Sequence, residues 1–319
     1  MTRASIRLEG TPELSTSYVA EPATHVPREE DLYTKVAIED AFVHSKQAEG
    51  SIYLPKHIES DTAVLYAPGF MEFEEATAPL ARELAKRGLV TITMKPLREQ
   101  PEESKRSWKH FNDPLILQQQ VIHALLKATK EQYGLERFDL AGHSMGADEV
   151  VGAAYHEVVN LEKRDVDIRS VVGDQPLGFD NGNLKKKALR RIWAIATRDL
   201  MSVPKMMEYR GEGFNEDAFN HIIHLDHVAL EGLQCLKRSK VPLRATALRA
   251  AGVKVGATTG ENDNFFRSWA VRLHSSHILD GHWEIPDADH LHANAYPADH
   301  AEFLKNVITE LNDGNTKAA

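Results

Sequence analysis

The sequence predicts an α/β protein with a mostly parallel, eight-stranded sheet flanked by helices and with a helical cap inserted between two of the strands. The first observation is that apolar runs of strand length alternate with segments of helical period, which is typical of a parallel sheet covered by helices on both faces. The second is length, because 319 residues of which 42% are hydrophobic can form one large core with an inserted subdomain.

Eight apolar runs have the length and the flanking turn residues expected of strands. In chain order they are Lys35–Val43, Ser51–Leu54, Ala63–Tyr66, Leu89–Met94, Phe138–Leu140, Ile168–Val172, Val253–Ala257 and Ser276–Leu279.

Helices between these strands are predicted from apolar spacing and from end signals. The predicted ends are Asp113 and Pro114 to Gly134, the neighbourhood of Pro79 to Gly88, and Pro297 onward. The buried stripes are Leu117, Val121, Leu125 and Ala128 in the first helix, and Phe303, Val307 and Leu311 in the last. These helices would cover the two faces of the sheet.

The chain divides into three predicted parts. Residues 1–33 are polar, punctuated by proline and without a periodic pattern, so we interpret them as an N-terminal extension. The α/β core takes up residues 34–178 and 246–319. Residues 179–245 interrupt the strand pattern with Met- and Trp-containing helical segments, and they are predicted to form a helical cap over the carboxyl edge of the sheet.

Composition excludes several classes of function. The formal net charge of −9 is spread over mixed signs, so no nucleic-acid partner is expected. No stretch has the length and hydropathy of a signal peptide or a membrane span, and the single Cys235 is compatible with a reducing compartment. A cytoplasmic protein is therefore expected, and a homo-oligomer remains open.

A candidate nucleophile lies in the stretch DLAGHSMGADEVVGAA, residues 139–154. A short strand enters the turn GHSMG, and a run of small residues suited to a helix leaves it. Gly142 and Gly146 lack the Cβ atoms that would collide in so tight a turn, and Ser144 would project above the sheet at a helix N-terminus. Strand, turn and helix together predict that Ser144 is a nucleophile.

A serine nucleophile needs a base, and the base needs an orienting carboxylate. Asp263 follows the predicted strand AGVKVGATTG, and His290 lies in the loop IPDADHLHANAYP before the last helix. The order Ser144, Asp263, His290 differs from that of the chymotrypsin and subtilisin classes. Glu261 remains an alternative acid, and His292 remains an alternative base.

The sequence resembles the α/β-hydrolase superfamily from about residue 35 to residue 311. The resemblance rests on YAPGF (66–70), GHSMG (142–146), GENDNFF (260–266) and DADHLHANAYP (287–297). It implies an oxyanion hole formed by the backbone N–H groups of Phe70 and Met145, with Gly69 allowing close approach. The family usually has a glycine shortly before its histidine, whereas this chain has Asp287, Ala288 and Asp289 there.

The resulting hypothesis is a serine hydrolase that cleaves a carboxylic ester or thioester of a small-molecule acyl substrate through an acyl-enzyme. No cofactor is required. Metal binding is not expected, because HIIHLDHV (221–228) lacks a required histidine where Ile222 stands, although His221 and His224 are spaced for a zinc pair. The alternatives are an acyltransferase with the same triad and a non-catalytic binding protein on the same fold.

Overall fold

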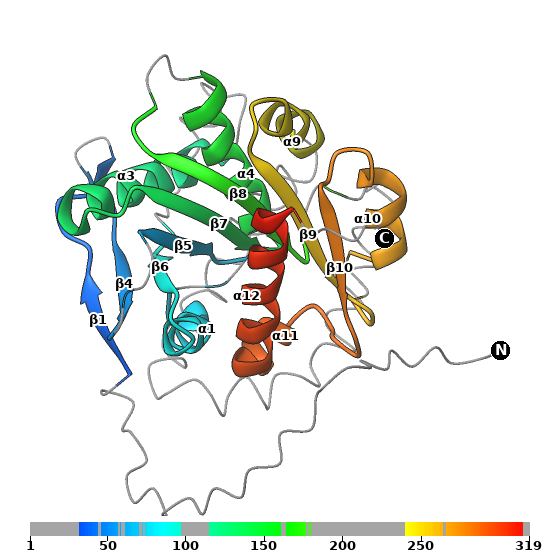
Figure 1. Ribbon diagram of the computed structural model, residues 1–319, viewed down its shortest axis with the longest axis horizontal. Coiled ribbons are helices and arrows are strands. Elements are labelled where there is room, and N and C mark those ends of the chain that lie inside the picture. Colours follow the sequence, from blue (N-terminus) through cyan, green and yellow to red (C-terminus); the bar gives the residue numbers. More distant parts are fainter. Residues whose placement is uncertain are drawn as a thin grey trace, which may run out of the picture.

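The computed structural model describes residues 32–43, 46–56, 58, 61–69, 72, 74–96, 115–160, 164–176, 179, 240–263 and 266–314. These residues contain an eight-stranded sheet in the order β1-β4-β6-β5-β7-β8-β9-β10 (Figure 1). Strands β1, β4 and β6 pair antiparallel at one side, and every other neighbouring pair is parallel. The predicted mostly parallel, eight-stranded sheet is confirmed.

The strands of the main sheet are β1 Tyr33–Ala37, β4 Gly50–Pro55, β5 Thr62–Ala67, β6 Val90–Met94, β7 Arg137–His143, β8 Asp167–Asp174, β9 Lys254–Gly260 and β10 Gly281–Ile285. Two further short strands, β2 Phe42–Val43 and β3 Lys46–Gln47, pair with each other. The central strand β5 is buried along its whole length, as its continuous apolar sequence predicts.

The helices are α1 Glu74–Lys86, α3 Ile116–Tyr133, α4 Met145–Tyr155, α9 Val241–Ala250, α10 Ser268–Ser275, α11 His292–Ala295 and α12 Pro297–Asp313, with a π-helix, η2 His156–Asn160, after α4. Helices α1 and α12 pack together on one face, and α3, α4 and α9 cover the other (Figure 1). Leu65 of β5 belongs to the core cluster on the α4 side, whereas Val64 and Tyr66 belong to the cluster on the α12 side. Because successive side chains of a strand point to opposite faces of the sheet, β5 contributes to the hydrophobic core on each face.

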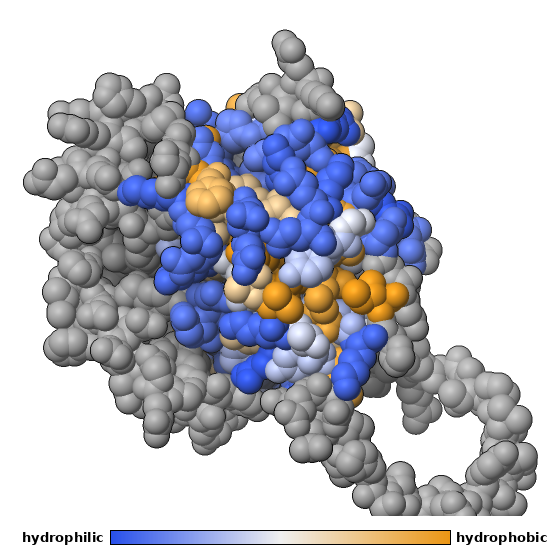
Figure 2. Space-filling model, turned by 90° about the vertical axis from the view of Figure 1, so that its left-hand side faces the viewer, coloured by the Kyte–Doolittle hydropathy of each residue, from blue (hydrophilic) through white to orange (hydrophobic). Residues whose placement is uncertain are grey.

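Edge strand β1 is mostly exposed. The space-filling view from that side shows a mainly hydrophilic surface with a small apolar group among the charged residues (Figure 2). Exposed apolar side chains of the described residues include Val36 on β1 and Phe42 on β2. Lys35 in the middle of β1 places a charge on the open edge, which discourages pairing with another chain.

Two strand predictions were wrong. The run 35–43 is not one strand, because Asp40 adopts a positive φ of 57° that turns the chain between β1 and β2. The run Ser276–Leu279 is a turn after α10, in which Ile278 and Leu279 are buried in the core without belonging to the sheet. The last strand is instead β10, Gly281–Ile285.

The helix predictions were closer to the structure. Helix α12 begins at Pro297, and α3 stops at Gly134, the capping residue after Tyr133, which has the left-handed φ of 69°, as predicted. Helix α1 begins earlier than predicted, at Glu74, and Pro79 lies inside it. The two acidic residues of its first turn favour a start there, and a proline this close to the N-terminus removes one helical hydrogen bond.

Some predictions concern residues outside the part of the chain that the structure describes. The helix opening at Asp113 and Pro114, and nearly all of the extension 1–33, lie outside the described residues. Of the cap range 179–245, only residue 179 and residues 240–245 are described, and α9 begins at Val241 and packs against α4. Among the described helices, none has the length and hydropathy to cross a membrane.

Candidate active site

Ser144 lies in a strained turn between β7 and α4. Its φ of 51° and ψ of −111° fall outside the regions that a serine ordinarily adopts. A Cβ at Gly142 would lie 2.2 Å from the carbonyl oxygen of Gly146, and a Cβ at Gly146 would lie 2.5 Å from that of Pro68. The Ser144 N–H donates to the carbonyl of Asp174 at 2.9 Å. The two glycines therefore permit a turn that no larger residue would allow.

The turn after β5 lies directly against this serine. A Cβ built on Gly69 would come within 3.2 Å of the Ser144 Cβ, so only glycine allows the approach. Met145 is the first residue of α4, and its side chain is buried. Of the two residues predicted to form an oxyanion hole, Met145 is thus next to the serine at a helix N-terminus, while Phe70 lies outside the described residues.

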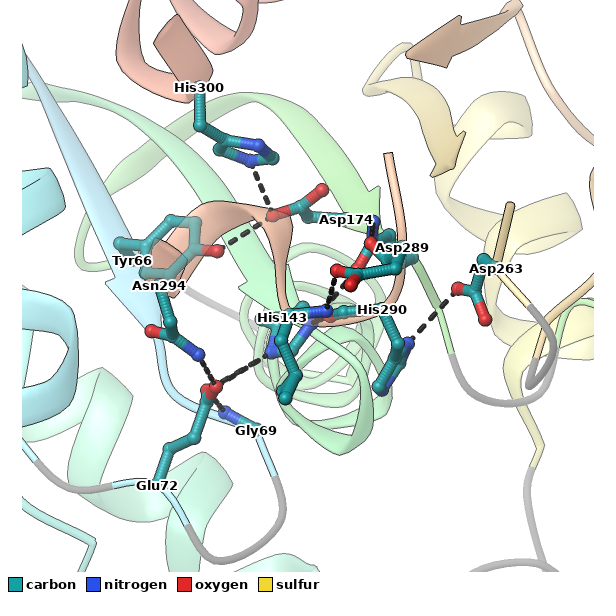
Figure 3. A network of polar contacts seen from close by, with 12 residues as sticks. Tyr66, Gly69, Glu72, His143, Asp174, Asp263, Asp289, His290, Asn294 and His300 are labelled. Carbon is teal, nitrogen blue, oxygen red and sulfur yellow. Dashed lines mark hydrogen bonds and ion pairs between the residues drawn. The ribbon is translucent and has the colours of Figure 1, made fainter. Parts of the chain in front are cut away.

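His290 and Asp263 are brought together from two different loops. The His290 Nδ1 lies 3.0 Å from Asp263 Oδ2, and both side chains are buried (Figure 3). The other carboxylate oxygen of Asp263 accepts the Phe266 N–H at 3.0 Å, and the Phe266 ring lies against the His290 ring. The alternative acid, Glu261, is exposed and accepts the Asp287 N–H. The predicted acid, Asp263, and the predicted base, His290, are therefore in contact. The Glu261 carboxylate instead contacts the main chain of Asp287.

The alternative base, His292, belongs to a different cluster. Its Nδ1 lies 3.2 Å from Nδ1 of His300, and its ring stacks on Tyr296. Burial, followed by the nearby positive charge of His300, lowers the pKa of His292 to about 4. His292 contacts neither the candidate acid nor the serine turn in any interaction that the structure gives it.

A buried carboxylate, Asp174, lies at the end of β8 beneath the site. It accepts hydrogen bonds from Tyr66 Oη at 2.7 Å and Thr258 Oγ1 at 2.6 Å, and His300 Nε2 lies 2.8 Å away (Figure 3). Burial alone would raise the pKa of Asp174, but the charge of His300, its hydrogen bond and the hydrogen bond from Thr258 hold the pKa well below its ordinary value. Asp174 therefore ties β5, β8, β9 and α12 together at the carboxyl edge of the sheet.

A second buried acid, Glu72, pairs with His143, the residue before Ser144. The Glu72 Oε1 lies 3.0 Å from His143 Nδ1. Burial alone would raise the pKa of Glu72 and lower that of His143. Their mutual attraction overrides burial, so the pKa of Glu72 falls to about 2 and that of His143 rises to about 10. Glu72 also accepts hydrogen bonds from the Gly69 N–H and the Asn294 amide.

Sequence reasoning assigned no role to these buried partners. Asp174 is the last residue of the apolar strand β8, and Asp263 comes shortly after β9, so a position at a strand end was a usable signal. His143 stands inside the motif GHSMG, but nothing in its spacing identifies a partner 71 positions away. Asp148, in the first turn of α4, is buried, and its Oδ1 lies 3.6 Å from the Nη1 of Arg244 in α9. The segment with His221 and His224 lies outside the described residues.

Comparisons with known proteins found similar solved structures. No family model and no curated protein matches the chain. A bacterial membrane phospholipase A is similar with a TM-score of 0.61 and 13% identity, over 88% of this chain and 87% of that one. An esterase from Thermogutta terrifontis follows at 0.51 and 14%, over 88% and 99%.

A bromoperoxidase from Bacillus anthracis is also similar, with a TM-score of 0.52 and 15% identity over 87% of this chain and 99% of that one. At identities this low, the structural similarity establishes the fold alone, and one fold can host several reactions. The strand order, the serine turn between β7 and α4, and these solved structures agree. This chain has the α/β-hydrolase fold.

Proposed function

We propose that the protein is a serine hydrolase that cleaves a carboxylic ester or thioester, with Ser144 as nucleophile, His290 as base and Asp263 as orienting acid. The observation that carries this proposal is the buried contact of 3.0 Å between His290 Nδ1 and Asp263 Oδ2. The strained backbone of Ser144 supports it, because such dihedrals persist only where the surrounding structure imposes them.

The proton arrangement follows from that contact. Asp263 accepts the N–H of His290 Nδ1, so the neutral ring carries its lone pair on Nε2. In the proposed first step, Nε2 takes the hydroxyl proton of Ser144 while the oxygen attacks the substrate carbonyl. The same proton is then given to the leaving alcohol or thiol. Asp263 keeps the tautomer fixed and stabilises the imidazolium while it exists.

The negative oxygen of the tetrahedral intermediate requires donors. We propose the backbone N–H groups of Met145 and Phe70, the former at the N-terminus of α4, where the helix dipole favours negative charge. Water, activated by His290, then attacks the acyl-Ser144 ester and releases the acid. Every group in this sequence is an amino-acid residue or water, so the proposed reaction uses no cofactor.

The substrate class rests on the fold and its neighbours. Solved structures of this fold include an esterase and a lipase-esterase related protein, and both names refer to ester cleavage. A small-molecule acyl ester is the simplest substrate for a serine turn of this kind. Transfer of the acyl group to an acceptor other than water would use the same first step.

Labelling with a fluorophosphonate probe tests the proposal. A nucleophilic Ser144 in the folded protein reacts covalently with the probe, and the adduct maps to the peptide that carries GHSMG. Ser144→Ala should abolish labelling, while the denatured wild-type protein should also fail to react. A folded wild-type protein that remains unlabelled would favour a binding role on the same fold and would overturn the proposed chemistry.

A further inference from the structure

The proposed mechanism leaves a buried charged pair unused, although it lies next to the serine. His143 immediately precedes Ser144, and its side chain and that of Glu72 are both buried. A buried ion pair costs desolvation, and it is weak evidence for stability by itself. Its position between the serine turn, the turn after β5 and the His290 loop raises the question of what it does there.

The hydrogen-bond partners of His143 define its charge. Nδ1 faces the Glu72 carboxylate at 3.0 Å, and Nε2 faces the carbonyl oxygen of His290 at 2.8 Å. Nε2 also faces Gln175 Oε1 at 3.2 Å, since the amide nitrogen of Gln175 donates to the Asp289 carbonyl. Every partner is an acceptor, and a neutral imidazole has one donor nitrogen only. With Glu72 as a carboxylate, this geometry requires an imidazolium at His143.

The contacts of Glu72 complete the arrangement. Its carboxylate accepts the backbone N–H of Gly69, in the turn against the serine, and the side-chain amide of Asn294 in α11 (Figure 3). Glu72 and His143 together thus join the turn after β5, the serine turn, and both ends of the segment 290–294. These are the segments that carry the candidate nucleophile, base and oxyanion donors.

We propose that His143 and Glu72 form a charged clamp in which the His143 imidazolium holds the main chain of His290, so that His143 is a positioning residue for the candidate base. This inference rests on the proposed function for its catalytic part. The clamp links the base to the residue adjacent to the nucleophile, and misplacement of a catalytic group by about 1 Å can cost roughly 100-fold in rate.

The charge of the clamp also matters for the chemistry. A lone carboxylate beside Gly69 would oppose the negative oxygen that develops next to Ser144, and His143 neutralises it. The groups that face His143 are Glu72, Asp174 from β8, and the His290 ring, whose centroid lies 4.8 Å away. The negative charge of Glu72 in turn offsets the repulsion between the charged His143 ring and the His290 ring when the latter gains its proton. The pKa of His143, raised to about 10, agrees with a permanent charge.

The first test is nitrogen-15 NMR of histidine-labelled protein, with His143→Gln used to assign the signals. Wild-type His143 should show two protonated ring nitrogens from about pH 5 to pH 9. In Glu72→Gln, the amide keeps the size of the side chain but has no charge and one acceptor oxygen where the carboxylate has two, so His143 should lose a proton within this range. A neutral wild-type His143 at pH 7 would overturn the proposal, whatever the enzymatic activity.

The second test measures hydrolysis of a p-nitrophenyl ester across pH. Glu72→Gln should lower kcat about 10- to 100-fold with little change in KM, and the loss should grow as His143 deprotonates. The matched control is Glu157→Gln, since Glu157 is also a buried carboxylate with a histidine partner, His123 at 3.0 Å, but lies in η2 beyond the far end of α4. That control should leave kcat unchanged.

The outcomes separate this inference from the proposed function. Unchanged kcat in Glu72→Gln, together with a neutral His143, would show that the charge positions nothing and would overturn the clamp. If the wild-type protein neither hydrolyses esters nor reacts with the fluorophosphonate, the proposed function fails. In that case the NMR signals of the His290 ring test the clamp. They should shift in Glu72→Gln and stay in place in Glu157→Gln.

Discussion

The carbonyl oxygen of His290 lies 2.8 Å from Nε2 of His143, the residue immediately before Ser144. Two segments 147 positions apart in the sequence are thus joined at the main chain. Because the same histidine ring contacts Glu72, the connection is part of a buried network. The site is therefore held by the residues beneath it as well as by the three proposed catalytic side chains.

The choice of acid is testable by two matched substitutions. Asp263→Asn should lower kcat by about 10⁴-fold, because the amide no longer stabilises the tautomer and the charge of His290. Glu261→Gln should leave kcat within a factor of about two, since the side chain of Glu261 is exposed and accepts the Asp287 N–H. Steady-state hydrolysis of a p-nitrophenyl ester measures both. A larger loss in Glu261→Gln would contradict the assignment.

The choice of base is tested in the same way. His290→Ala should remove nearly all turnover while leaving the fold in place, as near-native circular dichroism would show. His292→Ala should retain most of kcat, because His292 faces His300 and Tyr296. If His292→Ala were the inactive variant, the roles proposed for the two histidines would have to be exchanged.

The serine turn should tolerate no Cβ at Gly146. Gly146→Ala would place a methyl group 2.5 Å from the Pro68 carbonyl oxygen, and relief requires backbone movement. We expect a loss of about 3 kcal/mol or more in the free energy of unfolding. Gly88→Ala is the control, because its Cβ meets nothing within 4 Å and costs only the strain of a positive φ, about 1 to 2 kcal/mol. Urea denaturation that ranks the two variants the other way would contradict the geometry.

Stability should depend on pH through the pair of Glu72 and His143. The pKa of Glu72 falls from 4.5 to about 2 on folding, so its contribution is present above pH 4.5 and is lost as the pH falls toward 2. The pKa of His143 rises from 6.5 to about 10, so its contribution is present below pH 6.5 and is lost as the pH rises toward 10. Urea denaturation at a series of pH values should therefore show both losses in the wild-type protein. Glu72→Gln should be less stable near pH 6 and flatter on both sides, and identical curves would count against the pair.

Much of the architecture was predictable because local sequence encodes it. Buried parallel strands such as β5 are continuous apolar runs, and Pro297 marks the first residue of α12. Strand β10 was missed because its sequence, GHWEI, is half polar, as suits an edge, whereas the preceding Ile278 and Leu279 are buried in a turn. Local patterns do not distinguish burial in a strand from burial in a turn.

The part of the site that a sequence motif encodes was predictable. Ser144 and its two glycines form such a motif, and the loops of Asp263 and His290 follow strand ends. The contact between His143 and Glu72 was not predictable, because it depends on how the turn after β5 meets the turn after β7. Such a contact is defined only once the order of the strands is known.

Formation of an acyl-enzyme tests the central claim most directly. The folded protein is mixed with a p-nitrophenyl ester, quenched in acid within the burst phase, and examined by mass spectrometry of the intact chain and its peptides. The proposal predicts a mass increase equal to the acyl group on the peptide containing Ser144, absent in Ser144→Ala together with turnover. Undiminished turnover in Ser144→Ala, or an acyl group on another residue, would contradict it.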